Sequence, residues 1–463
     1  MLIRDFRRVL PFAVPLAIFF IVVGVHFYDN RLSFRWPSTS WTGGKEPGLH
    51  HDHSHEEDDA TFASQHHEIF SKSSHDGRYF MVEFGYGLHA INPSIIPHPF
   101  LNDTWIIAAQ LHRKQGATKD LAPNSVWIAE IGCSAAFNDD HTVLSCIAPP
   151  LTLPIAHTLG DPSKCTGNLD FLAFNIGPHD ARVFFGPDSP YIVYGSNSQF
   201  TCFGQWMADF RPLVDWGSEL FSPDNFRVAT EIQRPPPYGL VEKNFFIFWD
   251  NMGQKYAHYD MAPKRSFARL SNDGSVGPDL APLATQDEAC MTRLMPRAAS
   301  DLESVHQATN SLSITLCKRS DPTCKSTDEN TFIMTVFQHK SFYAFHGVYE
   351  PYVMLFKRTA PFEVHGISTK PLWIHGRGRP GQWKKIDPLG DPDGTNKNHQ
   401  PQLWNQTEMF YVTSISWKTH GQKYHGFLDD VMFLGFGIED ARTAGVDVLA
   451  GDILEGMGYC DSF

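Results

Sequence analysis

The pattern of apolar and polar positions divides the chain into three parts, and the first is a continuous apolar segment. Residues 9–28 (VLPFAVPLAIFFIVVGVHFY) are almost wholly apolar and long enough to span the core of a bilayer. Three arginines precede this segment and only Arg31 closely follows it, so the positive-inside rule places residues 1–8 in the cytosol. No small-residue cleavage site follows, which favours an uncleaved signal anchor over a cleaved signal peptide. We therefore predict a single-pass type II membrane protein.

The second part, residues 29–75, is polar and lacks periodic hydrophobicity, as is typical of a flexible stem. It contains a histidine-rich stretch that could bind a metal ion. A solvated linker requires no fixed ligand geometry and is the preferred interpretation. The histidines concerned are His50, His51, His53 and His55.

In the third part, residues 76–463, short apolar or alternating runs recur between Gly, Pro, Asn and Asp. This pattern predicts β-strands joined by tight turns, and long helical periodicity is scarce. Hairpin-like units recur at a spacing close to one four-stranded propeller blade. We therefore predict an all-β lumenal domain that is a five-bladed propeller, with an assembly of two-sheet sandwiches as the alternative. The five units lie at 104–112, 180–198, 243–260, 331–356 and 409–440.

Composition and cysteine usage agree with a secreted or lumenal domain. The formal net charge is -13, and we see no broad basic segment, so a nucleic-acid partner is not expected. All eight cysteines follow the apolar segment and none forms a CxxC motif, which predicts disulfides in an oxidising compartment. Cys317 and Cys324 flank a turn-like stretch and are predicted to pair. N-glycosylation sequons begin at Asn102 and Asn405.

Asp180 and Arg182 interrupt an apolar, strand-like run in IGPHDARVFF. Residues two apart on a strand point to the same side, so the carboxylate and the guanidinium would face together. On the inner strand of a propeller blade they would face the central channel, where ligands bind. A buried structural ion pair is the alternative.

Further polar residues interrupt apolar runs at comparable points and are candidate catalytic or substrate-binding groups. Carboxylates suit acid–base work at a glycosidic centre, and the many aromatic residues suit sugar rings. Two arginines in the Gly-rich loop HGRGRPG could bind a diphosphate. The candidates are His306, Asn310, His339, Arg377, Arg379, Asp430 and Asp440.

Common catalytic fingerprints are missing from the sequence, including GxSxG, HExxH, the P-loop and the Rossmann motif. A D-x-D triplet occurs at Asp391 and Asp393 in a stretch typical of a surface loop, and a chain of this length produces one such match by chance. We therefore predict that no cofactor is required, and a divalent metal ion is not supported.

The segment GPHDAR resembles the G-x-x-D-P-R segment of glycoside hydrolase family 130, the mannoside phosphorylases, whose relatives include β-mannosyltransferases with a five-bladed propeller. LDDVMFLGFGIEDARTAGVDVLAGDIL resembles that group's final blade, and INPSIIPHP with TWIIAAQ resembles the beginning of its first blade. The chain also resembles a group of fungal Golgi-type membrane proteins and the fungal β-1,2-mannosyltransferases. The resemblance implies that Asp180 is the catalytic aspartate, accompanied by Arg182, and that Asp440 is the acidic residue of the last blade. His179 and Ala181 depart from the family pattern.

We therefore predict a Golgi membrane glycosyltransferase that transfers mannose from a nucleotide sugar, GDP-mannose, to a glycan acceptor of the secretory pathway. Asp180 would act as the general base, and Arg182, with Arg377 or Arg379, would stabilise the leaving nucleotide diphosphate. A membrane-anchored glycoside hydrolase or phosphorylase that uses Asp180 and Asp440 is one alternative. A non-catalytic, glycan-binding propeller is the other.

Overall fold

Strands make up most of the regular structure in the described chain, and its helices are few and short. The predicted membrane anchor lies outside the described part, within which no helix is long and apolar enough to cross a membrane. The prediction of a mostly β domain is confirmed. The computed structural model describes residues 62, 64–112, 126–214, 216, 226–343, 346–384 and 404–460.

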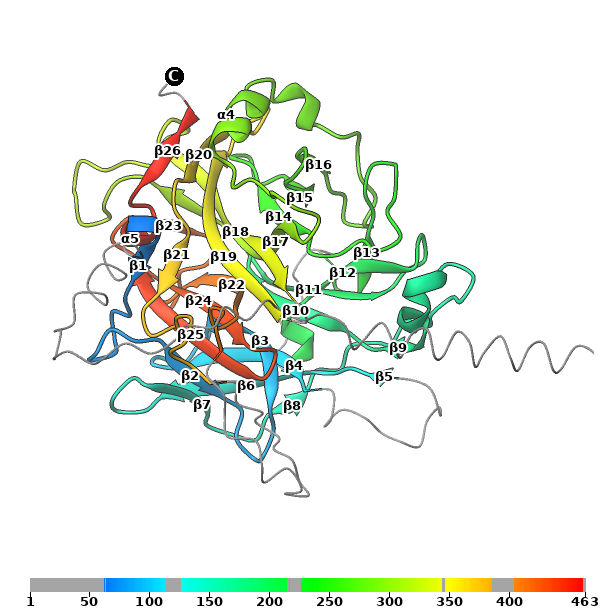
Figure 1. Cartoon of the computed structure of the whole chain (residues 1–463), viewed down its shortest axis with the longest axis horizontal. Helices are drawn as coiled ribbons and strands as arrows, with labels where there is room; N and C mark the ends of the chain where they lie inside the picture. The colour runs from blue at the N-terminus through cyan, green and yellow to red at the C-terminus, as the bar shows by residue number, and fades with distance from the viewer. Residues whose placement is uncertain are drawn as a thin grey trace, which may run out of the picture. The chain divides into compact units, whose positions relative to one another are not determined.

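Five antiparallel meanders contain most of the strands that the structure describes (Figure 1). The first comprises β3 (Ala90–Pro97), β4 (Trp105–Leu111), β6 (Glu130–Phe137) and β7 (Val143–Cys146), and β8 (Leu151–Thr152) pairs with β6. The second comprises β10 (His179–Phe185), β11 (Pro190–Asn197), β12 (Phe203–Asp209) and β13 (Thr230–Ile232). The third comprises β14 (Phe246–Trp249), β15 (Lys255–Asp260) and β16 (Ser266–Arg269).

The last two meanders complete the set, and a strand from the beginning of the described chain joins the fifth of them. The fourth comprises β17 (Glu303–Thr315), β18 (Thr331–Tyr343), β19 (His346–Lys357) and β20 (Val364–Ser368). The fifth comprises β22 (Phe410–Trp417), β24 (Val431–Ile438), β25 (Arg442–Leu449) and β2 (Phe80–Glu83). Because β2 also pairs in parallel with β7, it links the fifth meander to the first.

Shorter elements decorate these sheets. Two parallel pairs are formed by β1 (His67–Ile69) with β21 (Leu372–Ile374) and by β5 (Val126–Trp127) with β9 (Asn175–Ile176). β23 (His425–Phe427) pairs with β17, and β26 (Met457–Tyr459) pairs with β20. The helices are η1 (Gly167–Phe174), η2 (Arg211–Leu213), η3 (Ala281–Leu283), α4 (Asp287–Leu294) and α5 (Ala450–Ile453).

The first strands of the meanders lie side by side at the centre of the domain, where β3 packs against β10 and β22, and β17 packs against β14 and β22 (Figure 1). β17 has β23 beside its last residues, whereas β3, β10, β14 and β22 are each an edge of their own sheet, so the outer N–H and C=O groups of these four strands need partners. Side chains of the neighbouring first strands supply them: Ser94 accepts from the Val183 N–H at 3.0 Å, and Ser311 donates to the Ile247 carbonyl at 2.7 Å.

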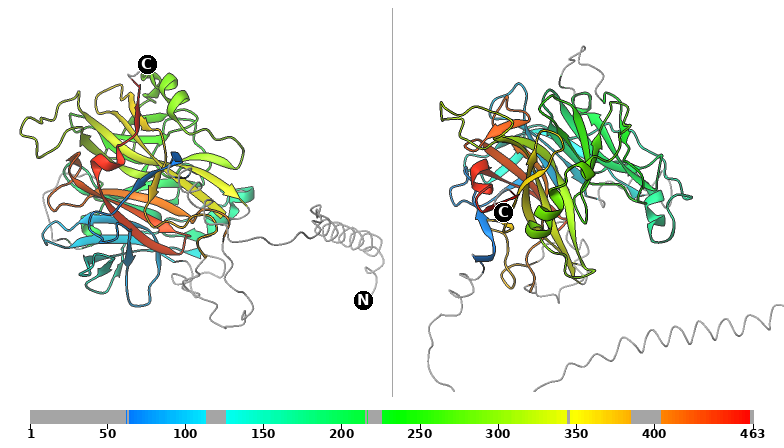
Figure 2. Two further views of the ribbon diagram at one scale, coloured as in Figure 1. Left: turned by 60° about the vertical axis from the view of Figure 1, so that its left-hand side comes forward. Right: turned by 90° about the horizontal axis from the view of Figure 1, so that it is seen from above.

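Apolar side chains fill the spaces between neighbouring meanders. One cluster joins the first and second meanders, through residues such as Ile106 and Ile192, and another joins the first and fifth, through Ile107 and Phe433. β11 is buried along its whole length because both of its faces are covered. Its composition of Tyr, Ile and Val suits such a strand. Figure 2 shows the green strands of the second and third meanders on one side of the domain and the blue and red strands on the other.

The structure corrects the predicted boundary between stem and domain. β1, at His67–Ile69, lies within the predicted stem of residues 29–75 but pairs with β21, and Ser71 donates a hydrogen bond to buried Asp447. The hydrophobic pattern is too short there to reveal a strand, because β1 contributes a single buried side chain, Ile69.

All eight cysteines form disulfides, which confirms that prediction. The predicted Cys317–Cys324 pair is also confirmed. The other three bridges close loops that the sequence alone does not pair: Cys133–Cys146, Cys165–Cys202 and Cys290–Cys460.

Candidate functional site

Three meanders begin with the same backbone feature. Asn92 and Asp180 lie within the first three residues of β3 and β10, Asn244 lies two residues before β14, and their φ angles are positive, at 58°, 48° and 65°. Asn and Asp adopt this left-handed conformation more readily than other non-glycine residues, because their short polar side chains hydrogen-bond locally. Asp180 is therefore the one carboxylate among three residues that share a backbone position.

Three hydrogen bonds hold Asp180 and the residue after it. The Asn92 side chain donates from Nδ2 to Asp180 Oδ1 at 2.7 Å. The Asp180 N–H donates to Gln110 Oε1 at 2.9 Å, and the next N–H, that of Ala181, donates to Glu130 Oε1 at 3.1 Å. An unusual backbone conformation persists only where its surroundings fix it in this way. The carboxylate is thus held in one orientation.

Arg182 lies beside Asp180 but does not form an ion pair with it among the described residues. Its side chain is 2% exposed, and Nη2 donates to Asn244 Oδ1 at 2.6 Å. Its buried Nε has no hydrogen-bond partner within the described part of the chain. A buried donor without a partner is unfavourable. The Nε–H of Arg182 is therefore a candidate hydrogen-bond donor to a molecule that binds in this site.

A chain of polar contacts leads from Arg182 to the fourth and fifth meanders. Asn244 Nδ2 lies 3.2 Å from His306 Nε2, which in turn lies 3.0 Å from the Tyr411 hydroxyl. Burial, together with the positive charges of Lys243 and Lys340, lowers the pKa of His306 to about 3, so the ring is neutral at ordinary pH. Burial raises the pKa of Tyr411 to about 12. We call Asp180, Arg182, Asn244, His306 and Tyr411 the central cluster.

Asp440 approaches the central cluster from the turn between β24 and β25, with a φ of 49°. Burial raises the pKa of Tyr349, and the negative charges of Asp440 and Asp180 act in the same direction. Both charges also act on Tyr411. The two predicted catalytic carboxylates therefore lie close to the same two tyrosines, although they come from different meanders.

A pocket of about 290 Å³ opens beside the central cluster. η1 forms one wall and presents Phe171, which is 59% exposed. Gly195 on β11 also lines the pocket, and a Cβ atom there would lie 2.5 Å from the Phe203 ring. The remaining lining residues are Leu169, Leu172, Asn175, His179, Asp180, Arg182, Phe203, Gln205, Val241, Lys243 and Asn244.

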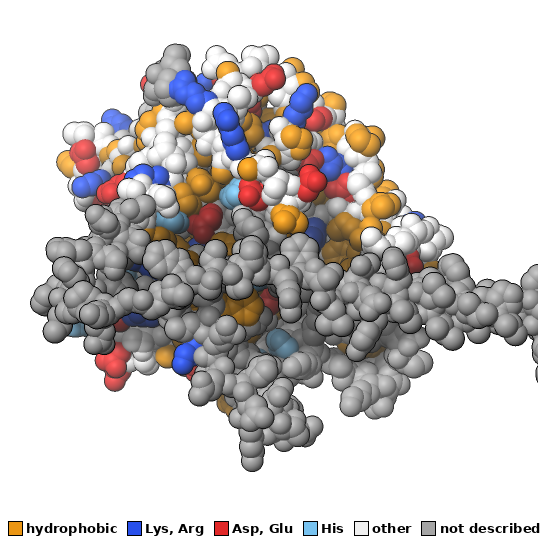
Figure 3. Space-filling view, in the orientation of Figure 1, with side chains coloured by type: hydrophobic (Ala, Val, Ile, Leu, Met, Phe, Trp, Pro, Cys, Tyr) orange, Lys and Arg blue, Asp and Glu red, His pale blue; other side chains and the backbone are white. Residues whose placement is uncertain are grey.

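Charges of both signs surround this site. Lys243 is exposed at the pocket, and Lys340 lies over the Tyr349 ring at 5.4 Å. Burial and the neighbouring positive charge of Lys243 lower the pKa of Lys340, which Asp440 opposes. On the face of the molecule in Figure 3, charged side chains of both signs are interspersed over the described surface.

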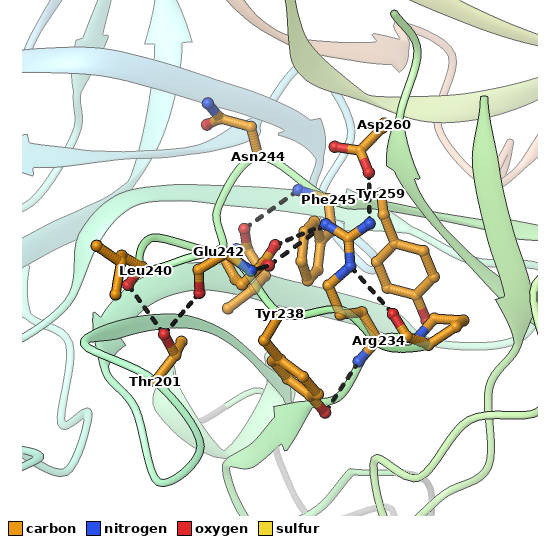
Figure 4. Close-up of polar contacts among 12 residues, drawn as sticks. Thr201, Arg234, Tyr238, Leu240, Glu242, Asn244, Phe245, Tyr259 and Asp260 are labelled. Atoms are coloured by element: carbon orange, nitrogen blue, oxygen red, sulfur yellow. Dashed lines mark hydrogen bonds and ion pairs between the residues drawn. The ribbon is translucent and has the colours of Figure 1, made fainter. Parts of the chain in front are cut away.

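An ion-pair network supports the segment that leads to Lys243 and Asn244. Arg234 donates to Glu242 Oε2 at 3.0 Å and to Asp260 Oδ2 at 2.5 Å, and its guanidinium lies over the Tyr259 ring (Figure 4). Glu242 also accepts from the Gly239 N–H. These contacts close the segment from 234 to 244 into a loop that carries the third-meander side of the pocket.

The structure places five of the predicted ligands away from the pocket. Arg377 was predicted to bind a diphosphate, but it is 5% exposed, lies over the Trp373 ring and donates to the Glu408 carbonyl. It stabilises packing instead. Arg379 lies over the Phe62 ring at 4.2 Å and does not line the pocket.

Asn310, His339 and Asp430 have other roles. Asn310 hydrogen-bonds both backbone groups of Ile415 and so joins β17 to β22. His339 is paired with Glu303 at 3.3 Å, on the opposite face of the sheet from His306, because its position on β18 is one residue beyond the partner of His306. Asp430 accepts two hydrogen bonds from Arg319 and lines a different pocket of about 870 Å³.

Several site residues escaped the sequence analysis. Asn92, Asn244, Lys243, Tyr411 and Glu130 come from short polar interruptions that are indistinguishable from turns by composition alone. The signal that could have found two of them is an Asn or Asp at the start of each recurring apolar strand. Asn102 and Asn405 are exposed, as glycosylation requires, and their modification stays a prediction.

Within the described ranges, no group of three or more His, Cys, Asp or Glu side chains is placed to hold a metal ion. The histidine-rich stretch of the stem, His50 to His55, lies outside those ranges, as do Asp391 and Asp393.

Comparisons with known proteins give little beyond this geometry. No protein-family model matches the chain, and no curated protein matches it. A candidate glycoside hydrolase from Bacteroides ovatus is similar at a TM-score of 0.36 and 10% identity, over 80% of this chain and 89% of that one. A thermostable family-43 glycoside hydrolase gives 0.32 and 10%, over 81% and 91%, and the RS223 β-xylosidase gives 0.33 and 12%, over 78% and 92%. All three TM-scores are below 0.5, so the likeness is a coarse one.

Proposed function

We propose that this protein binds a glycan in the pocket beside the central cluster and cleaves a glycosidic bond there. In this proposal the five meanders are the blades of a five-bladed propeller, and the pocket lies at one end of its axis. The observation that carries the proposal is the placement of Asp180: an oriented carboxylate, held by Asn92, that lines a pocket with hydrogen-bonding groups and one exposed aromatic ring.

The chemistry requires a group that accepts or donates a proton at the glycosidic oxygen, and usually a second carboxylate. Asp180 is the first, because it is the acidic residue that lines the pocket. Asp440 is the second, since it acts on the same tyrosines as Asp180. Neutral His306 and the Tyr411 hydroxyl supply hydrogen bonds without adding charge.

Phe171 gives the pocket an apolar face at its opening. An exposed phenyl ring is unfavourable in water unless a ligand covers it, and the C–H face of a sugar ring is a suitable cover. Arg182 lines the same pocket and supplies a fixed donor, since its Nε has no partner among the described groups. The combination of one ring and several directional donors is typical of carbohydrate sites.

Transfer from a nucleotide sugar is the second candidate, and one observation favours it. The cations Arg182, Lys243 and Lys340 outnumber the carboxylates Asp180 and Asp440 around the site, so an anionic group on a substrate would be attracted. Arg377 and Arg379 no longer support this candidate, because neither lines the pocket. Mannose as the sugar, the Golgi membrane as the location and the signal anchor over 9–28 stay proposals.

The test is an assay of the full chain against a panel of oligosaccharides and aryl glycosides, with released sugar as the readout. Parallel reactions contain inorganic phosphate or a nucleotide sugar with a glycan acceptor. Release in buffer alone supports the hydrolase. Product that requires phosphate or the nucleotide sugar supports transfer instead. Glycan binding without product in any reaction would contradict both enzymatic proposals.

A further inference from the structure

Glu130 lies directly behind Asp180 and is completely buried. It belongs to β6, the third strand of the first meander, and its exposed fraction is 0%. Its Oε1 accepts from the Ala181 N–H at 3.1 Å, while its cross-strand partner Gln110 accepts from the Asp180 N–H at 2.9 Å. Two adjacent side chains thus fix two consecutive N–H groups at the left-handed turn that presents the Asp180 carboxylate.

The second meander contains the same device with an amide in place of the acid. Gln205 lies on β12, the third strand of that meander, and its Oε1 accepts from the Phe245 N–H at 3.3 Å. Phe245 follows Asn244 as Ala181 follows Asp180. An amide oxygen therefore suffices to hold this backbone, and the carboxyl group of Glu130 must be explained by something else.

A carboxyl group differs from an amide because it can release its proton and become negatively charged. Glu130 Oε2 is buried and has no hydrogen-bond partner among the described residues, so an ionised Glu130 would be a poorly solvated charge. Burial raises the pKa of Glu130 well above its ordinary value, and the negative charge of Asp180 raises it further. The packed strands β4, β7 and β8 contain no charged residue, and β10 contributes His179, Asp180 and Arg182.

We propose that Glu130 is a positioning residue for Asp180, which holds the backbone of Asp180 and stays protonated so that this corner of the site carries one negative charge. Like charges at short range do not both ionise readily, and ionisation is least favourable for Glu130, which is completely buried. The catalytic part of this role rests on the proposed function, whereas the protonation of Glu130 does not.

The first test needs no substrate. The free energy of unfolding of the full chain is measured by denaturant titration at pH 5 and pH 8, for the unchanged protein and for Glu130→Gln. The folded protein holds a proton on Glu130 that the unfolded chain releases above about pH 4.3, so its stability falls with rising pH. Glutamine has no proton to release, so Glu130→Gln does not undergo this decline. The free energy of unfolding of Glu130→Gln minus that of the unchanged protein should therefore increase from pH 5 to pH 8.

Coupling to Asp180 is tested by repeating the comparison in an Asp180→Asn background. Removal of the neighbouring charge lowers the pKa of Glu130, so in a series extended to pH 10 the gain from Glu130→Gln should stop growing at a lower pH in the Asp180→Asn background. A gain that levels off at the same pH in both backgrounds, or no gain in either, would overturn the proposal. If Glu130→Gln fails to fold, Asp180→Asn alone still tests it, because its decline of stability with rising pH should level off at a lower pH than that of the unchanged protein.

The second test uses activity. Ionisation of Glu130 would place an unpaired buried charge against the strand that presents Asp180, so the unchanged enzyme should lose activity at the alkaline end of its pH profile. Glu130→Gln should stay active to a pH at least one unit higher than the alkaline limit of the unchanged enzyme. The control is Glu231→Gln, which alters a buried glutamate outside the pocket and should leave the profile unchanged. The same alkaline limit in Glu130→Gln would contradict the role. If no activity is found at all, the proposed function fails while the stability test still decides the state of Glu130.

Discussion

Asp180→Asn should abolish most of the activity while leaving the fold intact. The substituted residue must keep a φ near 48°, and asparagine already does so at the equivalent positions of Asn92 and Asn244, with φ of 58° and 65°. The 2.7 Å hydrogen bond from Asn92 would change from a charged to a neutral acceptor, which weakens it by about 1 kcal/mol. We therefore expect the free energy of unfolding at pH 7 to change by about 1 kcal/mol or less.

The effect on catalysis should be much larger. A positioned general acid or base contributes roughly 10²- to 10⁴-fold to the rate, equivalent to about 3–5 kcal/mol of barrier. An amide has no proton of suitable acidity and cannot replace it. Glycan cleavage by Asp180→Asn should therefore fall by about that factor, while the affinity for a glycan, measured by calorimetry, stays within about threefold because the shape of the pocket is unchanged.

Two comparison variants separate the catalytic effect of the carboxylate from an effect on backbone stability. Asp188→Asn alters an exposed aspartate on the same hairpin, outside the pocket, and should leave activity unchanged. Asp180→Ala removes the carboxylate and places alanine in the left-handed region, so it should lose about 1 kcal/mol more stability than Asp180→Asn. If folded Asp180→Asn retains its activity within tenfold, Asp180 is not the proton carrier. If it loses more than about 3 kcal/mol of stability, the residue is primarily structural.

Three further predictions follow from neighbouring features. Phe171→Ala should weaken glycan binding about tenfold, since it removes apolar contact with the sugar worth roughly 1–2 kcal/mol. Phe174 is exposed on the same helix but does not line the pocket, so Phe174→Ala should not weaken binding. Equal affinities of the two variants would contradict a contact between Phe171 and the sugar. The pKa of His306 is lowered to about 3, so below about pH 6.5 the unfolded chain binds a proton that the folded protein does not, and the free energy of unfolding falls with falling pH. His306→Asn should lose less free energy of unfolding over this range, as measured by denaturant titration. An unchanged dependence of stability on pH would refute this. Arg234→Met leaves Glu242 buried without its partner and should cost about 3 kcal/mol in thermal unfolding, partly restored by adding Glu242→Gln.

The sequence contains enough to predict the strands and the first two site residues. Apolar runs separated by turn residues mark nearly every strand of the meanders, and Asp180 with Arg182 stand out because they interrupt such a run. The alternative for these two residues, a buried structural ion pair, is not seen among the described residues: both line the pocket, and Arg182 donates to Asn244. A bulge between His179 and Arg182 makes this possible, and bulges leave no reliable mark on the apolar pattern.

The predicted ligands that lie outside the pocket share a physical feature. Arg377 and Asn310 look like ligands because they are polar residues among apolar ones, but each satisfies backbone groups of a neighbouring strand. A protein whose sheets present their edge strands to one another needs many such buried donors and acceptors. Polarity inside an apolar run therefore marks a junction between meanders as often as a binding site, and only the three-dimensional partner distinguishes the two.

One corner of the molecule carries polar groups that packing between meanders does not explain. The domain uses the same left-handed turn at Asn92, Asp180 and Asn244, and the acceptor behind the turn is an amide at Gln205 but an acid at Glu130. The amide version, at Asn244 and Gln205, meets the structural requirement completely. At Asp180 and Glu130 both positions are acidic, and the fold gains nothing from this that amides would not give. It must instead accommodate a buried group that holds a proton, next to a carboxylate at a pocket. Such an arrangement is unfavourable for stability, and acid–base chemistry is the use that needs it.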